Sequence, residues 1–148
     1  MINKEEGFIL YEALIALALL TLPFAYFSFD ILDYLALKKE ATTLVYDLRT
    51  VRDMATVKYK PSQFPITVSS APEMRYNNKT YQIRKRFNSK YTIVKEVTFP
   101  ASTNISWGTK NISFAPDGTT TDNTTIILTK GRYQFAVVID VVGRIRLE

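Results

Sequence analysis

The chain has 148 residues, with 19 Lys and Arg against 14 Asp and Glu, and it contains neither Cys nor His. These absences exclude disulfides, thiolate or imidazole metal sites and His-dependent nucleophilic catalysis, and the five glycines are too scattered for a phosphate-binding loop. We therefore expect no enzyme, no catalytic residues, no cofactor and no metal site. This length accommodates one domain, or one small domain with an appendage.

An apolar segment occupies residues 8–29, where the only charged side chain is that of Glu12. A helix of this length rises about 33 Å, enough to cross the hydrocarbon core of a bilayer. We expect a single-pass helix in the cytoplasmic membrane. A carboxylate in such a helix costs about 2.5–3.5 kcal/mol, so Glu12 requires a partner or a function. Pro23 removes a backbone hydrogen bond in the middle of the segment, which predicts a kink.

The pattern of Gly7 and Phe8, followed by Glu12 and a long apolar helix, resembles the class III signal of type IV pilins and pseudopilins. The resemblance implies that residues 1–7 are a leader peptide. A prepilin peptidase would cut between Gly7 and Phe8 on the cytoplasmic side and methylate the new N-terminus. Glu12 would then neutralise the Phe8 amine of a neighbouring subunit during filament assembly, and residues 8–29 would form the filament core.

A helical pattern continues through residues 30–60 and stops before Pro61. Apolar side chains recur on one face, whereas charged side chains are expected on the other faces. We expect this amphipathic helix to continue the apolar one as a single rod, with its apolar face covered by a β domain. The apolar positions are Leu44, Leu48, Val51 and Ala55, and the charged ones are Asp47, Arg49, Arg52 and Asp53.

Residues 61–148 change to short strands separated by turn residues such as Asn77-Asn78-Lys79. We expect a mainly antiparallel sheet that buries one face on the helix. The predicted fold class is α+β and type IV pilin-like, with a long N-terminal helix, half transmembrane and half amphipathic, packed on a C-terminal antiparallel β-sheet head. The expected strands are 65–69, 73–76, 80–87, 91–99, 111–114, 124–129, 133–140 and 144–147.

The end of the chain, from residue 112 through Asp117-Gly118 to Gly143-Arg144, resembles the C-terminal region of minor pseudopilins of the GspH type. Small size, the lack of Cys and a basic head are most similar to the competence-pseudopilus minor pilins of Gram-positive bacteria, the ComGD type. The resemblance implies a structural filament subunit that supports DNA uptake. Its partners would be other major and minor pseudopilins, the prepilin peptidase and the membrane. The N-terminus would lie in the cytoplasm and the head outside, with the processed chain at the cell surface.

Three alternatives remain open at this point: an unprocessed, membrane-anchored receptor or adaptor, a minor pseudopilin of a protein secretion system, and a head that binds DNA directly. The DNA alternative depends on a stretch between Met74 and Lys95 that has seven basic and no acidic residues. Strand alternation places Tyr81, Ile83 and Phe87 on one face and the arginines on the other. Such a surface can hold phosphates without reading sequence, although the favoured interpretation is a solvated basic face, or one that meets acidic neighbours or the anionic cell surface. The candidate contacts are Arg75, Lys79, Arg84, Arg86 and Lys90.

Overall fold

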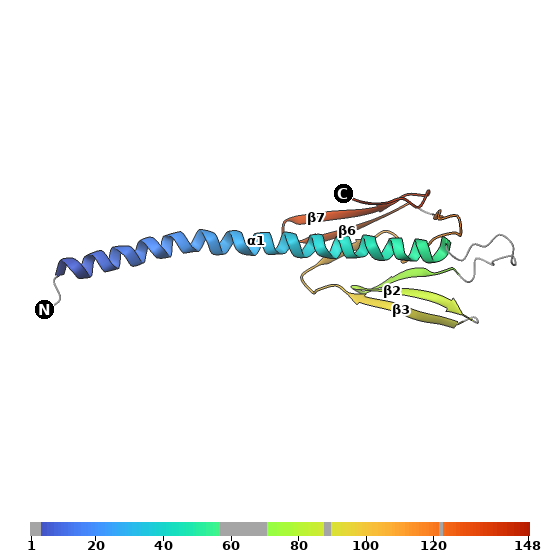
Figure 1. The fold of residues 1–148 in the computed structure, drawn as a ribbon, viewed down its shortest axis with the longest axis horizontal. Helices are drawn as coiled ribbons and strands as arrows, with labels where there is room; N and C mark the ends of the chain where they lie inside the picture. The colour runs from blue at the N-terminus through green and yellow to red at the C-terminus, as the bar shows by residue number, and fades with distance from the viewer. Residues whose placement is uncertain (1–3, 57–70, 88–89, 122) are drawn as a thin grey trace. The chain divides into compact units, whose positions relative to one another are not determined.

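The computed structural model describes residues 4–56, 71–87, 90–121 and 123–148, leaving aside the side chains of 4–9, 22–29 and 86–87. This part of the chain contains one helix and eight strands. The helix, α1 (Lys4–Thr56), has 53 residues and is the blue-to-green helix of Figure 1. Residues 1–35 and 36–148 form two compact units, which are described separately.

Helix α1 begins before the apolar segment and ends at Thr56. Several of its threonines satisfy their hydroxyls within the helix, as Thr42 does by donating to the carbonyl oxygen of Lys38 over 2.8 Å. The helical backbone continues through Pro23, whose side chain is among those not described, so the kink remains a prediction. The expected extension of the helix over residues 57–60 lies outside the described residues.

The unit of residues 36–148 contains two antiparallel sheets of four strands each. Sheet A has the strand order β3-β2-β1-β5 and sheet B the order β4-β6-β7-β8, so the chain visits A, then B, then A, then B. The strands of sheet A are β1 (Glu73–Asn77), β2 (Thr80–Phe87), β3 (Lys90–Thr98) and β5 (Asn111–Ser113). Those of sheet B are β4 (Asn104–Trp107), β6 (Thr124–Lys130), β7 (Tyr133–Ile139) and β8 (Ile145–Leu147).

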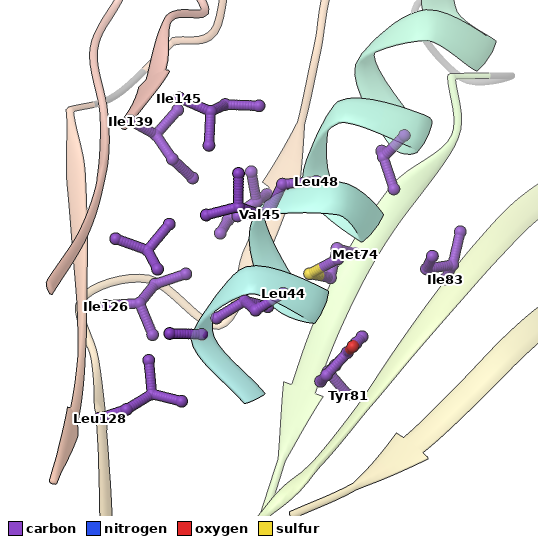
Figure 2. Packing of buried hydrophobic residues seen from close by; sticks show 14 of the residues in the cluster. Leu44, Val45, Leu48, Met74, Tyr81, Ile83, Ile126, Leu128, Ile139 and Ile145 are labelled. Atoms are coloured by element: carbon purple, nitrogen blue, oxygen red, sulfur yellow. The ribbon is translucent and has the colours of Figure 1, made fainter. Parts of the chain in front are cut away.

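The hydrophobic core of this unit lies where the C-terminal part of α1 passes between the two sheets. Leu44 and Leu48 are fully buried, with Ile126 of sheet B on one side and Met74 of sheet A on the other (Figure 2). Each fully buried aliphatic side chain contributes about 1.5–3 kcal/mol of transfer free energy. The expected apolar face of residues 44, 48, 51 and 55 is confirmed, since all four are buried.

Contacts of β4 and β8 connect the sheets and α1 to one another. Trp107 of β4 stacks on Tyr76 of β1, with ring centroids 4.6 Å apart and planes 4° apart. On the other side of the unit, Arg52 of α1 donates to the carbonyl oxygen of Gly143 over 3.2 Å, just before β8. Gly143 has a φ of 77°, and a Cβ there would lie 1.8 Å from the carbonyl oxygen of Gly118, so this close crossing of two loops requires glycine.

The predicted fold class is wrong in the form given above. By elements the described chain is mostly β, with eight strands in two separate antiparallel sheets rather than one sheet against a helix. The single-sheet prediction fails because strand alternation shows which face is buried but not which strands pair. Strand β4 was not predicted, and the predicted strand 65–69 lies outside the described residues.

Within the described part of the chain, no helix combines the length with the sustained apolar character that crossing a bilayer requires. This finding contradicts the expected transmembrane helix and the expected single-pass location in the cytoplasmic membrane, while the membrane as a partner stays a prediction.

Candidate functional site

Two surfaces of the described chain could serve a function, and the first is the apolar part of α1. Seven large apolar side chains between residues 10 and 20 are 43–66% exposed. At 100° per residue their positions are distributed around the whole circumference of the helix. A helix that is apolar on every side needs cover on every side. The seven residues are Leu10, Tyr11, Leu14, Ile15, Leu17, Leu19 and Leu20, which we call the apolar collar.

Glu12 is exposed within the apolar collar. Its carboxylate forms no hydrogen bond or ion pair with any described residue, although a charge surrounded by apolar side chains gains most from a partner when the surface is covered. Gly7 and Phe8 lie in the first turns of the same helix, and Phe8 precedes Glu12 by four residues, which is one helical turn. Because the side chains of residues 4–9 are not described, the roles of Gly7, Phe8 and Glu12 stay predictions.

The second surface is sheet A, where the structure does not gather the predicted basic residues into one patch. The side chain of Arg84 is mostly buried, forms an ion pair with Glu73 and places its guanidinium carbon 4.7 Å from the ring centroid of Tyr91. Lys79 donates from its ammonium group to the carbonyl oxygen of Ala101 over 2.6 Å. These two side chains are therefore already engaged within the head.

The other basic candidates lie apart from Arg84 and Lys79. Arg75 is exposed and lines a shallow hollow at the β1 side of sheet A together with Asn77, Asn78 and Lys110. Lys90 is exposed at the start of β3, on the opposite side of the sheet, and the side chain of Arg86 is not described. The five residues remain predicted contacts for DNA. The structure places the side chains of four of them, all except Arg86.

A polar cluster in the core was missed by the sequence analysis. Asp47 of α1 is only 1% exposed, and its carboxylate accepts hydrogen bonds from the Tyr81 hydroxyl at 2.6 Å and from the Lys95 ammonium at 2.7 and 2.8 Å. Burial and the bond to Asp47 raise the pKa of Tyr81 far above its ordinary value. Asp47 was expected on a face of the helix other than the apolar one, and the structure shows that this face of α1 is buried as well, against Tyr81 and Lys95 of sheet A.

A β-bulge in β3 explains how Lys95 reaches Asp47. Ile83 pairs with Lys95 whereas Arg84 pairs with Ile93, so Val94 is the extra residue on β3. Residues paired across two strands point to the same face of the sheet. Lys95 and Val97 therefore point inward with their partners Ile83 and Tyr81. Beyond the bulge, Ile93 points outward with its partner Arg84. Neither residue type nor spacing predicts this bulge, which is seen only in the register of the paired strands.

Comparisons with known proteins give no further guidance about these surfaces: no family model matches the chain, and no curated protein or solved structure matches it. The assignment of a function therefore depends on the sequence motif and on the surfaces described above.

Proposed function

We propose that the chain is a structural, non-catalytic subunit of a pseudopilus-type filament that supports DNA uptake. The observation that carries the proposal is the apolar collar, Leu10 to Leu20, whose seven large side chains are 43–66% exposed on all sides of α1. A single flat partner would cover one side of such a helix. A bundle of equivalent helices from neighbouring pilin-like subunits would cover all of them.

The energetics of the collar support assembly. Covering the exposed half of one large aliphatic or aromatic side chain contributes roughly 1 kcal/mol, so the collar as a whole supplies on the order of 5–10 kcal/mol per subunit. This amount is comparable to the translational and rotational freedom that a subunit loses on association, about 4–15 kcal/mol. Assembly would therefore depend on additional contacts, for which the exposed Glu12 is the first candidate.

Processing would complete the site around Glu12. Cleavage of the peptide bond between Gly7 and Phe8 creates an α-ammonium group at Phe8, one helical turn before Glu12. In a bundle, the Glu12 carboxylate of one subunit and the Phe8 ammonium of the next neutralise each other inside an apolar contact. An unpaired charge at that place would oppose assembly, so the pair also fixes the register of neighbouring helices.

The first test is the intact mass of the protein isolated from its own host, with and without the prepilin peptidase. We expect a chain that begins at a methylated Phe8 when the peptidase is present and at Met1 when it is absent. A chain that begins at Met1 in both cells would contradict the processing step and, with it, the proposed role of Glu12.

The second test is Glu12→Gln, which removes the charge and keeps the size of the side chain. We expect normal processing and at least tenfold lower recovery in sheared filaments. The matched control is Glu96→Gln, which neutralises an exposed acid in β3 whose carboxylate accepts a hydrogen bond from Gln82 at 3.0 Å. Wild-type recovery of Glu12→Gln, or an equal loss for Glu96→Gln, would contradict the assembly role.

A further inference from the structure

The exposed edge of sheet A is β3, and it differs from the other sheet edges. The outer strands β4, β5 and β8 have three or four residues each, whereas β3 has nine and pairs, among the described strands, only with β2. An edge strand of that length presents backbone N–H and C=O groups that a further strand can pair with. Short edges offer very few such groups.

The bulge at Val94 gives one half of this edge an unusual surface. If the alternation from Lys95 and Val97 continued without a bulge, Ile93 and Tyr91 would face inward. Instead they face outward with Arg84, and Tyr91, Ile93 and Val94 are 50%, 50% and 55% exposed. Bulges often re-aim side chains at edges in this way. The outward face of β3 from Tyr91 to Val94 therefore presents exposed apolar side chains, with the Arg84 guanidinium of β2 over the Tyr91 ring.

The inward face of the same half of β3 is polar and basic. Thr92 pairs with Lys85, and Lys90 pairs with the last residue of β2, so Lys90, Thr92 and Lys85 share one face. Lys90 and Thr92 are both exposed. Between Met74 and Lys95 the sequence has no acidic residue to balance these charges. An incoming strand would thus meet apolar side chains on one face and cations on the other.

We propose that the edge of β3 from Lys90 to Val94 binds an extended strand of a partner protein in which apolar and acidic residues alternate. Side chains of an added strand alternate between the faces of the sheet, so its apolar residues would lie beside Tyr91 and Ile93 while its carboxylates lie beside Lys90. The backbone pairing supplies affinity and the two faces supply specificity. All the residues involved belong to the unit 36–148, so the inference is independent of filament assembly.

Charge decides against a second copy of this chain as the occupant. Pairing the segment from Lys90 to Val94 with its counterpart in another copy would add a second Lys90 and no acidic side chain, because this segment contains none, and like charges on neighbouring strands are destabilising. An acidic strand removes this repulsion.

The test uses the full-length chain in a nonionic detergent, which covers the apolar collar without adding charge. The probe is a capped seven-residue peptide in which Glu alternates with Val. We expect binding at low salt that slows hydrogen exchange of the β3 amides. Two control peptides, one with Lys in place of Glu and one with N-methylated valines, are expected to bind at least tenfold more weakly because they lack the charge or the backbone donors.

Matched variants locate the site. Lys90→Glu is expected to weaken binding about fivefold, whereas Lys110→Glu, next to β5 at the opposite edge of sheet A, is expected to leave it unchanged. Ile93→Ser is likewise expected to weaken binding, with Val142→Ser, an exposed valine before β8, as its control. The proposal would be overturned if the Lys peptide bound as well as the Glu peptide, or if the two charge reversals had equal effects. It would also be overturned if β3 became protected without peptide as the protein concentration rises, a result that would assign the edge to a second copy.

Discussion

The buried carboxylate of Asp47 offers the sharpest test of how α1 is attached to sheet A. The variant Lys95→Met keeps the aliphatic stem of residue 95 and removes its ammonium group, which lies 2.7 Å from Asp47 Oδ1. Tyr81, at 2.6 Å, is then the remaining donor to the carboxylate among the described contacts. In this variant the Asp47 carboxylate has lost the opposite charge of Lys95, and it stays too deeply buried to be hydrated instead.

The expected cost follows from the burial of the two side chains. Removing one partner of a fully buried ion pair costs about 3–5 kcal/mol. The Asp47 side chain is 2% exposed but that of Lys95 is 42% exposed, so water partly replaces the lost ammonium. We therefore expect Lys95→Met to lower the free energy of unfolding by about 2–3 kcal/mol. Asp47→Asn should cost less, about 1 kcal/mol, because the ammonium it leaves behind is already half solvated.

The assay is equilibrium urea unfolding of the full chain in nonionic detergent, followed by the fluorescence of Trp107. The double variant Lys95→Met/Asp47→Asn is expected to be less destabilised than Lys95→Met alone, since no buried charge remains without a partner. Lys110→Met, which removes an exposed ammonium elsewhere, serves as the control and should stay within about 0.5 kcal/mol of wild type. A similarly small change for Lys95→Met, or strict additivity in the double variant, would refute the reasoning.

Three further predictions concern single residues of the same unit. Gly143→Ala should lower the melting temperature by about 8 °C or more, since a Cβ at φ 77° would collide with the Gly118 carbonyl oxygen. Burial and Asp47 raise the pKa of Tyr81, so above a pH of about 10 the unfolded chain releases a proton that the folded chain keeps. Stability should therefore fall with rising pH, by up to about 1.4 kcal/mol per pH unit, and urea unfolding of Tyr81→Phe should lack this part of the loss. Arg84→Met should lower the urea midpoint by an amount equivalent to about 1–3 kcal/mol, because it leaves the mostly buried Glu73 carboxylate without its ion-pair partner.

The parts of the fold that depend on local pattern could be predicted from the sequence. The alternation through Ile126 and Leu128 indicated β6, and both side chains are buried as that pattern requires. The turn at Asn78 and Lys79 was also predicted, and both residues have the positive φ that a tight hairpin turn uses. In these cases each residue carries its own signal, and no distant partner is needed to interpret it.

The parts that depend on pairing between distant residues could not be predicted. Strand β4 has four residues, and its stability comes from pairing with β6 and from Trp107 stacking on Tyr76 across to sheet A. Burial of Asp47 requires Lys95 to face inward, which depends on a bulge at Val94 that residue type does not announce. The roles of Gly7, Phe8 and Glu12 stay predictions that rest on the motif, because they concern proposed contacts with other molecules rather than contacts within the described chain.

The alternating path of the chain through the two sheets has a consequence for how the unit opens. The hairpins β1-β2-β3 and β6-β7-β8 join neighbours in sequence, so each can form from a local stretch of chain. Strands β4 and β5 lie between these hairpins in the chain. Strand β4 completes sheet B, whose other three strands follow it in sequence, and β5 completes sheet A, whose other three strands precede it. These two strands pair over only four and three residues, and the chain between each of them and its partner strand is longer than a hairpin turn. Local opening of the unit should therefore begin at residues 104–113 and detach one strand from each sheet. Neither sheet is then expected to unfold while the other stays complete.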